Sequence, residues 1–140
     1  MIHKITCLVV IGLFFAVIPA IDGSPEKEQA AVASAKKWLN MVDQGKYVES
    51  WMEAATLFRN AATQEQWKQS LQAVRKPLGK LLSRKLTTKT YRTTLPGAPD
   101  GDYVVIEFET SFENKKSAVE TVTPMIDKDG KWYVSGYYIK

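Results

Sequence analysis

The chain has 140 residues, which is enough for one domain and short for two of ordinary size. Hydrophobic types make up 45% of the residues and charged types 24%, a mixture that excludes an intrinsically disordered protein. Lys and Arg total 19 against 15 Asp and Glu, so the net charge of +4 is far below that of a polybasic tail.

The first 23 residues have the pattern of an export signal. A positively charged start with Lys4 precedes the apolar run of residues 5–20, and small and helix-breaking residues follow it. This pattern is typical of a secretory signal peptide, and the run is short for a membrane span. We predict cleavage after Ala20 or Gly23, a single mature domain over residues 24–140 without stable membrane insertion, and a secreted or periplasmic location. An uncleaved N-terminal anchor is the alternative.

The cysteine and histidine content restricts the chemistry of the mature chain. The single Cys and the single His, Cys7 and His3, both lie in the predicted signal. Without them the chain can form no disulfide, no Cys/His zinc site and no His-based catalytic triad. We predict no metal and no cofactor, and any enzyme would have to use Asp, Glu, Lys, Tyr or Ser.

Apolar residues at helical spacing predict three helices in the first half of the mature chain. The first begins at Ser24 and stops at Gly45, the second covers residues 47–58, and the third follows a capping box of Thr63 and Gln66. The predicted inward faces are Ala31, Ala35, Trp38, Leu39 and Val42 in the first helix, Tyr47, Trp51, Ala54, Ala55 and Phe58 in the second, and Trp67, Leu71, Val74 and Leu78 in the third.

Beyond residue 79 the apolar period changes to two, which predicts strands over residues 86–93, 103–112, 118–126 and 131–139. A Pro- and Gly-rich loop at 95–101 and tight turns separate them. The expected fold is therefore α+β, with three N-terminal helices packed on a curved antiparallel meander sheet of about four strands. In the second strand we expect a core face of Val104, Ile106, Phe108, Thr110 and Phe112 and a wetter face of Tyr103, Val105, Glu107, Glu109 and Ser111.

Several short phrases of this sequence together resemble a known family. They are Trp38-Leu39, Asp43-x-Gly45-x-Tyr47, Ser50-Trp51-x-x-Ala54-Ala55-x-x-Phe58, Gln66-Trp67, Arg75-x-Pro77-x-Gly79, Leu95-Pro96-Gly97-x-Pro99-Asp100-Gly101-x-Tyr103-Val104-Val105, Glu120-Thr121-Val122-Thr123 and Asp129-Gly130-x-Trp132-x-Val134-x-Gly136-Tyr137. In order and spacing they resemble the secreted bacterial domain-of-unknown-function family 4019, over essentially the whole mature chain. The resemblance implies a bacterial exported protein and carries no catalytic residue. The layout is also similar to the cone-shaped fold of nuclear transport factor and ketosteroid isomerase, which says little about function.

Positive charge is concentrated in residues 66–99, where no acidic residue occurs. One interpretation is a basic face for an anionic partner such as lipid head groups or a cell-wall polymer, with nucleic acid disfavoured by export. The interpretation that we favour pairs Lys89 and Arg92 with Glu107 and Glu109 across neighbouring strands, at roughly 0.2–1 kcal/mol per pair.

Large aromatic residues fall on the predicted inward faces. Together with Glu120, they could line a pocket for a small apolar ligand in a cone-shaped fold. They could equally fill the core, which we favour, since each large ring buries about 150–250 Å². The residues are Trp51, Phe58, Trp67, Phe108 and Trp132.

Glu120 shares its parity with Ala118, Val122 and Ile126 and is therefore expected to point inward. A buried carboxylate needs a cationic partner, for which Arg75 and Arg84 are the candidates, and we expect the structural ion pair to form with Arg75. The alternative is a catalytic base assisted by a Tyr donor.

We assign no catalytic residue. The sequence favours an exported bacterial protein that acts as a non-catalytic binding or interaction module in the cell envelope. Its partner would be an unknown envelope component or a small apolar ligand, and not a nucleic acid. The alternative function is a small lyase- or isomerase-like enzyme that uses a carboxylate base in a cone-shaped pocket.

Overall fold

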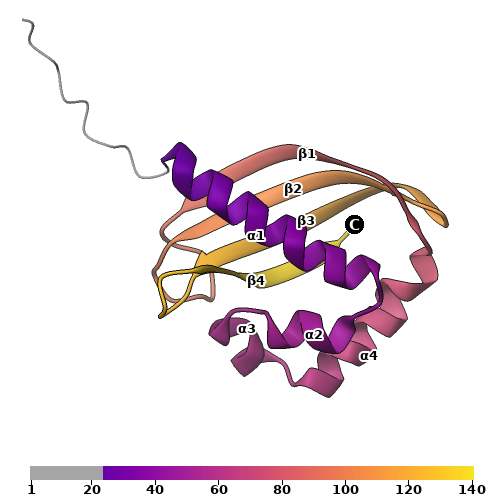
Figure 1. Ribbon diagram of the computed structural model, residues 1–140, viewed down its shortest axis with the longest axis horizontal. Coiled ribbons are helices and arrows are strands. Elements are labelled where there is room, and N and C mark those ends of the chain that lie inside the picture. The colour runs from indigo at the N-terminus through magenta and orange to yellow at the C-terminus, as the bar shows by residue number, and fades with distance from the viewer. Residues whose placement is uncertain (1–23) are drawn as a thin grey trace, which may run out of the picture.

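The computed structural model describes residues 24–140, so the predicted signal segment, with His3 and Cys7, lies outside the described residues. The described chain is α+β, as predicted, and its sheet is curved and unclosed (Figure 1). The helices are α1 (Pro25–Asp43), α2 (Tyr47–Met52), α3 (Thr56–Ala61), α4 (Gln64–Val74) and the short 3-10 helix η1 (Lys76–Leu78). The strands are β1 (Leu81–Arg92), β2 (Tyr103–Phe112), β3 (Lys115–Ile126) and β4 (Trp132–Ile139), which pair antiparallel in chain order.

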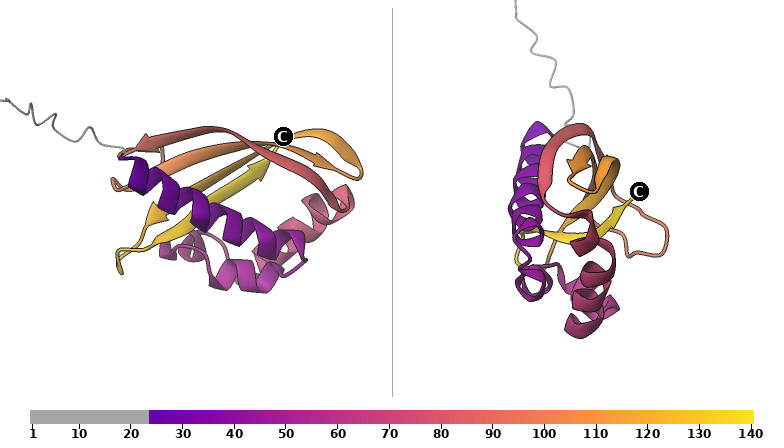
Figure 2. Two further views of the ribbon diagram at one scale, coloured as in Figure 1. Left: turned by 45° about the horizontal axis from the view of Figure 1, so that its top comes forward. Right: turned by 90° about the vertical axis from the view of Figure 1, so that its right-hand side faces the viewer.

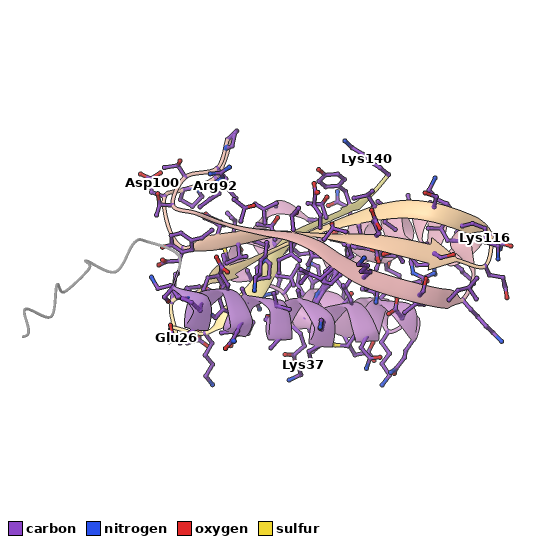
Figure 3. All side chains as sticks on the ribbon, turned by 90° about the horizontal axis from the view of Figure 1, so that it is seen from above. Glu26, Lys37, Arg92, Asp100, Lys116 and Lys140 are labelled. Carbon is purple, nitrogen blue, oxygen red and sulfur yellow. The ribbon has the colours of Figure 1, made fainter. Side chains whose placement is uncertain are left out.

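Helix α1 lies across one face of the sheet, and α2, α3 and α4 gather beyond the β4 side (Figures 1 and 2). The Ser24 side chain caps its start by accepting from the Lys27 N–H, and Gly45 follows its end with a φ of 75°. Glu26 and Lys37 point away from the sheet (Figure 3). The opposite face of α1 is buried, as predicted, through Ala31, Ala35, Trp38, Leu39 and Val42. Among residues 24–140, no helix is both long enough and apolar enough to cross a membrane.

The predicted second helix is in fact two short ones, α2 and α3, because tertiary contacts interrupt it. The Ala55 N–H donates to the Val134 carbonyl oxygen of β4 at 2.8 Å. The backbone N–H and the hydroxyl of Thr56 both donate to the Asp127 carboxylate, at 2.8 and 2.9 Å. These bonds turn the chain towards the β3–β4 hairpin, and helical spacing alone does not reveal them.

Strand β2 has the predicted core face, whose five residues are all buried. Tyr103 was expected on the wetter face and is instead fully buried. Its hydroxyl donates to the Pro99 carbonyl oxygen at 2.6 Å, and the loop before β2 folds over its ring. The capping box of Thr63 and Gln66 is confirmed at the start of α4.

The predicted cross-strand ion pairs are wrong, because the register of β1 differs. Strand β1 starts at Leu81, five residues earlier than predicted, and Lys89 lies opposite Ile106 while Arg92 lies opposite Tyr103. Lys89 instead approaches Glu28 of α1 at 3.7 Å. Val74, predicted to point inward, is 52% exposed, because it borders an open hollow between α4 and Tyr138 and Ile139 of β4.

Candidate functional site

Four charged side chains and one tyrosine, from five separate elements, meet at the C-terminal end of α1. We call the group of Asp43, Arg75, Arg84, Glu120 and Tyr137 the ion network. Asp43 is the last residue of α1, Arg75 caps the end of α4, and the other three lie on β1, β3 and β4. Two arginines and two carboxylates give the network no net formal charge.

Glu120 is fully buried at the centre of the ion network. Its Oε1 accepts from Arg84 Nε at 2.7 Å and from the Thr110 hydroxyl at 2.6 Å. Its Oε2 accepts from Arg84 Nη2 at 3.2 Å and from the Tyr137 hydroxyl. A carboxylate has about four lone-pair sites, so these four donors saturate it.

Arg84 joins the two carboxylates of the network. Besides its two bonds to Glu120, it donates from Nη1 and Nη2 to the two oxygens of Asp43, at 2.8 and 3.0 Å. Burial lowers the pKa of Arg84, but the hydrogen bonds and charges of Asp43 and Glu120 outweigh it and raise that pKa further above its ordinary range. Paired bonds of this kind fix the geometry of both carboxylates.

Arg75 pairs with Asp43 and not with Glu120, which corrects the expected pairing. Its Nη2 donates to Asp43 Oδ1 at 3.3 Å, and its Nη1 donates to the Gly79 carbonyl oxygen at 2.6 Å. The guanidinium stands 4.5 Å from the ring centre of Phe112, and its buried Nε lacks a hydrogen-bond partner within the described chain. Arg84 pairs with Glu120 because β1 and β3, which carry these two residues, flank β2 on its two sides.

Tyr137 links the ion network to a group of rings. Burial, followed by the nearby charge of Glu120, raises the pKa of its hydroxyl, which therefore stays protonated as a donor. Its ring packs edge-on against Trp38 at 5.2 Å between centroids. The indole N–H groups of Trp38 and Trp67 donate to the backbone oxygen and the hydroxyl of Ser50, at 2.8 and 2.9 Å. These bonds hold α1, α2 and α4 around the network.

The aromatic residues proposed for an apolar pocket make core contacts. Phe58 packs edge-on against Trp67 at 4.8 Å, and Phe108 is buried beneath α1. The Trp51 indole donates to the Ala62 carbonyl oxygen, and Trp132 borders a small hollow of about 70 Å³. Phe58 and Phe108 therefore fill the core, whereas Trp67 also lines an open, mostly apolar hollow of about 370 Å³ between α4 and the end of β4.

An open cleft of about 540 Å³ adjoins the ion network at the ends of α1 and α4. Asp43 and Arg75 belong to both the cleft and the ion network. We call the cleft the polar cleft. Its lining comes from the turn after α1, from α2, α4 and η1, and from the β2–β3 turn. The lining residues are Asp43, Gln44, Gly45, Tyr47, Val48, Glu49, Lys68, Gln72, Arg75, Lys76, Gly79, Lys80 and Glu113.

The role of Asp43 was missed at the level of the sequence, where the residue enters only through the phrase Asp43-x-Gly45-x-Tyr47. One signal could have revealed it. The sequence offered two inward arginines, Arg75 and Arg84, but only one inward carboxylate, Glu120. Two buried cations need a second acidic partner, and Asp43 is that partner. No group of three or more His, Cys, Asp or Glu side chains that could hold a metal occurs within residues 24–140.

Comparison with protein-family models matches residues 34–137 to the family described as protein of unknown function (DUF4019). The match covers well over half of the chain, and the chain belongs to this family, as the sequence phrases indicated. No curated protein and no solved structure matches it.

Proposed function

We propose that this member of the DUF4019 family is an exported, non-catalytic binding module of the bacterial cell envelope. The export pattern of residues 1–23 supports the location. The saturated Glu120 carboxylate supports a structural and not a catalytic role for the ion network, and it is the observation that carries the proposal. The polar cleft beside the network is the binding surface.

A general base needs a free lone pair on its carboxylate that can reach a substrate proton. On Glu120 four donors occupy both oxygens, and the side chain has no exposed surface. Releasing one charge-assisted bond costs about 1.5–3 kcal/mol. Tyr137 already donates to Glu120, so its hydroxyl is not free to stabilise an oxyanion. At Glu120 and Tyr137, the lyase- or isomerase-like alternative therefore has neither a free base nor a free oxyanion donor.

The polar cleft has the size of a small-molecule site. Such sites commonly enclose about 300–1,000 Å³, and the cleft has about 540 Å³. Its back wall is held by the bonds of Arg75 and Asp43, so little rearrangement is needed when a ligand enters. Walls that are already ordered reduce the entropic cost of binding.

The test uses protein that a bacterial host has exported from the full chain, labelled with ¹⁵N. Addition of the low-molecular-mass fraction of an envelope extract should shift the amide signals of Gln44, Gly45, Gln72 and Gly79, which line the cleft. Signals from exposed residues of α1, such as Lys37, serve as the internal control and should stay in place. Shifts confined to other surfaces would contradict the cleft as the binding site. The mass of the same protein should lack its first 20 or 23 residues, and retention of Met1 would contradict export with cleavage.

A further inference from the structure

Five charged side chains border the polar cleft without pairing with one another. They are Lys68, Lys76, Lys80, Glu49 and Glu113, and none of them forms a salt bridge to any other residue in the described part of the chain. Opposite charges thus line one hollow while staying free of protein partners. Charged side chains in such a place can pair with a ligand without first breaking an internal bond.

The three lysines all come from one acid-free stretch of sequence. Lys68 lies on α4, Lys76 on η1 and Lys80 directly before β1, and no acidic residue occurs between Glu65 and Asp100. The wall behind them is electrically balanced, because Arg75 and Arg84 share Asp43 and Glu120. The surplus of positive charge in the cleft therefore comes from the lysines alone.

The backbone that carries Lys76 and Lys80 is fixed against the β2–β3 turn. The Leu78 and Lys80 carbonyl oxygens accept from the backbone N–H groups of Asn114 and Glu113, both at 2.9 Å. Gly79 has a φ of 76°, and a Cβ built there would lie 2.7 Å from Glu113 Oε1. This side of the cleft is therefore preorganised, and Glu113 lies directly against it.

We propose that the polar cleft binds a small ligand through an anionic group, a carboxylate or a phosphate, which the ammonium groups of Lys68, Lys76 and Lys80 contact. The inference rests on the proposed binding function and names its ligand class. Lysine supplies a compact point charge with three donors, which suits a phosphate or carboxylate approached from several sides. Tyr47 and Gln72 offer neutral hydrogen-bonding groups for the rest of the ligand.

Glu49 and Glu113 restrict which anions fit. Two carboxylates at the same cleft repel a densely charged polyanion and favour a ligand that also carries a cation or a neutral polar part. Because of these two carboxylates, we expect the lysine-lined cleft to select among anionic ligands and to disfavour polyanions. The same anionic group could be offered by a free small molecule or by a lipid head group.

The experiment titrates the exported protein with inorganic phosphate and, in a second arm, sediments it with vesicles of anionic phospholipid. Vesicles of zwitterionic phospholipid are the control for the second arm. The test variant is Lys76→Gln/Lys80→Gln. The matched control is Lys36→Gln/Lys37→Gln, which makes the same charge change on exposed residues of α1.

Phosphate should shift the amides of residues 68, 76 and 80. Each lost charge-assisted contact weakens binding by roughly tenfold or more, so the test variant, which loses two, should bind about a hundredfold more weakly, while the control stays within about twofold. Phosphate binding identifies a free small ligand. Vesicle binding that needs Lys76 and Lys80, without a phosphate shift, identifies a lipid head group. Equal weakening in both variants, or no binding in either arm, would overturn the inference. In that case, cleft shifts with the envelope extract would leave the proposed binding function standing.

Discussion

Replacing the central carboxylate by its neutral isostere, Glu120→Gln, should strongly destabilise the fold. The amide of Gln keeps one acceptor oxygen and replaces the other with an N–H₂ donor. Whichever way the amide turns, its nitrogen faces Arg84 together with either Thr110 or Tyr137, and these are donors. The hydroxyl can rotate to accept from the amide N–H₂, but Arg84 can only donate, so one of its hydrogen bonds is lost and two donor groups face each other.

The expected magnitude follows from these contacts. Each hydrogen bond to a charged group contributes about 1.5–3 kcal/mol, and breaking a buried ion pair costs about 3–5 kcal/mol. Asp43 still neutralises part of the Arg84 charge, which places the loss within that range. For a domain of this size the unfolding midpoint Tm should fall by roughly 10–25 °C. Of a typical total stability of about 5–15 kcal/mol, such a loss is a large share.

The assay is urea denaturation followed by tryptophan fluorescence, since Trp38 and Trp67 pack against Tyr137. The matched control is Glu109→Gln, the same change at an exposed position of β2, which should cost less than about 0.5 kcal/mol. A double-mutant cycle with Arg84→Met should give coupling above about 1 kcal/mol, and the cycle with Arg75→Met a smaller value. An unchanged or raised midpoint for Glu120→Gln would refute the structural role of the network.

Three further predictions concern other parts of the same framework. Gly79→Ala should cost more than Gly130→Ala. Both positions have a positive φ, 76° and 78°, but Gly79 also has a ψ of −155°, a region that essentially only glycine occupies and that costs other residues about 1–3 kcal/mol, and an added Cβ there would meet Glu113. Equal urea midpoints would contradict this prediction. Ser50→Ala removes the acceptor of the Trp67 indole and should cost about 1–3 kcal/mol with a shift in tryptophan emission, whereas unchanged emission would place Trp67 elsewhere. The Thr56 backbone N–H lowers the pKa of Asp127, so its contribution to stability is full above the ordinary Asp range near about pH 4 and is lost as pH falls through the folded pKa. Asp127→Asn should therefore flatten the acid side of the stability profile measured by urea denaturation, and a slope equal to that of the wild-type protein would contradict this assignment.

Regular local patterns made much of the fold predictable from the sequence. The period of two in residues 103–112 identified the core face of β2, and the inward parity of Glu120 agrees with its burial. The capping box at Thr63 marked the start of α4 correctly. In each case the signal lies within a few neighbouring residues.

What the sequence did not reveal depends on contacts between distant segments. The break between α2 and α3 follows from bonds to Val134 and Asp127, more than seventy residues further along the chain. Arg84 takes Glu120 because the strand register places them on either side of β2, and the predicted start of β1 was five residues too late to indicate this. The polar cleft likewise forms where five separate segments meet, so no local sequence pattern predicts it.

The distinction between binding and catalysis can be measured directly with Tyr137→Phe, which keeps the ring and removes the hydroxyl that Glu120 accepts from. The exported wild-type protein and this variant are each incubated with the low-molecular-mass fraction of an envelope extract, and the composition is followed over time by mass spectrometry. A binding module leaves the amount of every component constant in both samples, apart from the fraction that it holds. A component that the wild-type protein consumes over many turnovers, and that Tyr137→Phe consumes more slowly, would contradict the account and place the chemistry at Glu120.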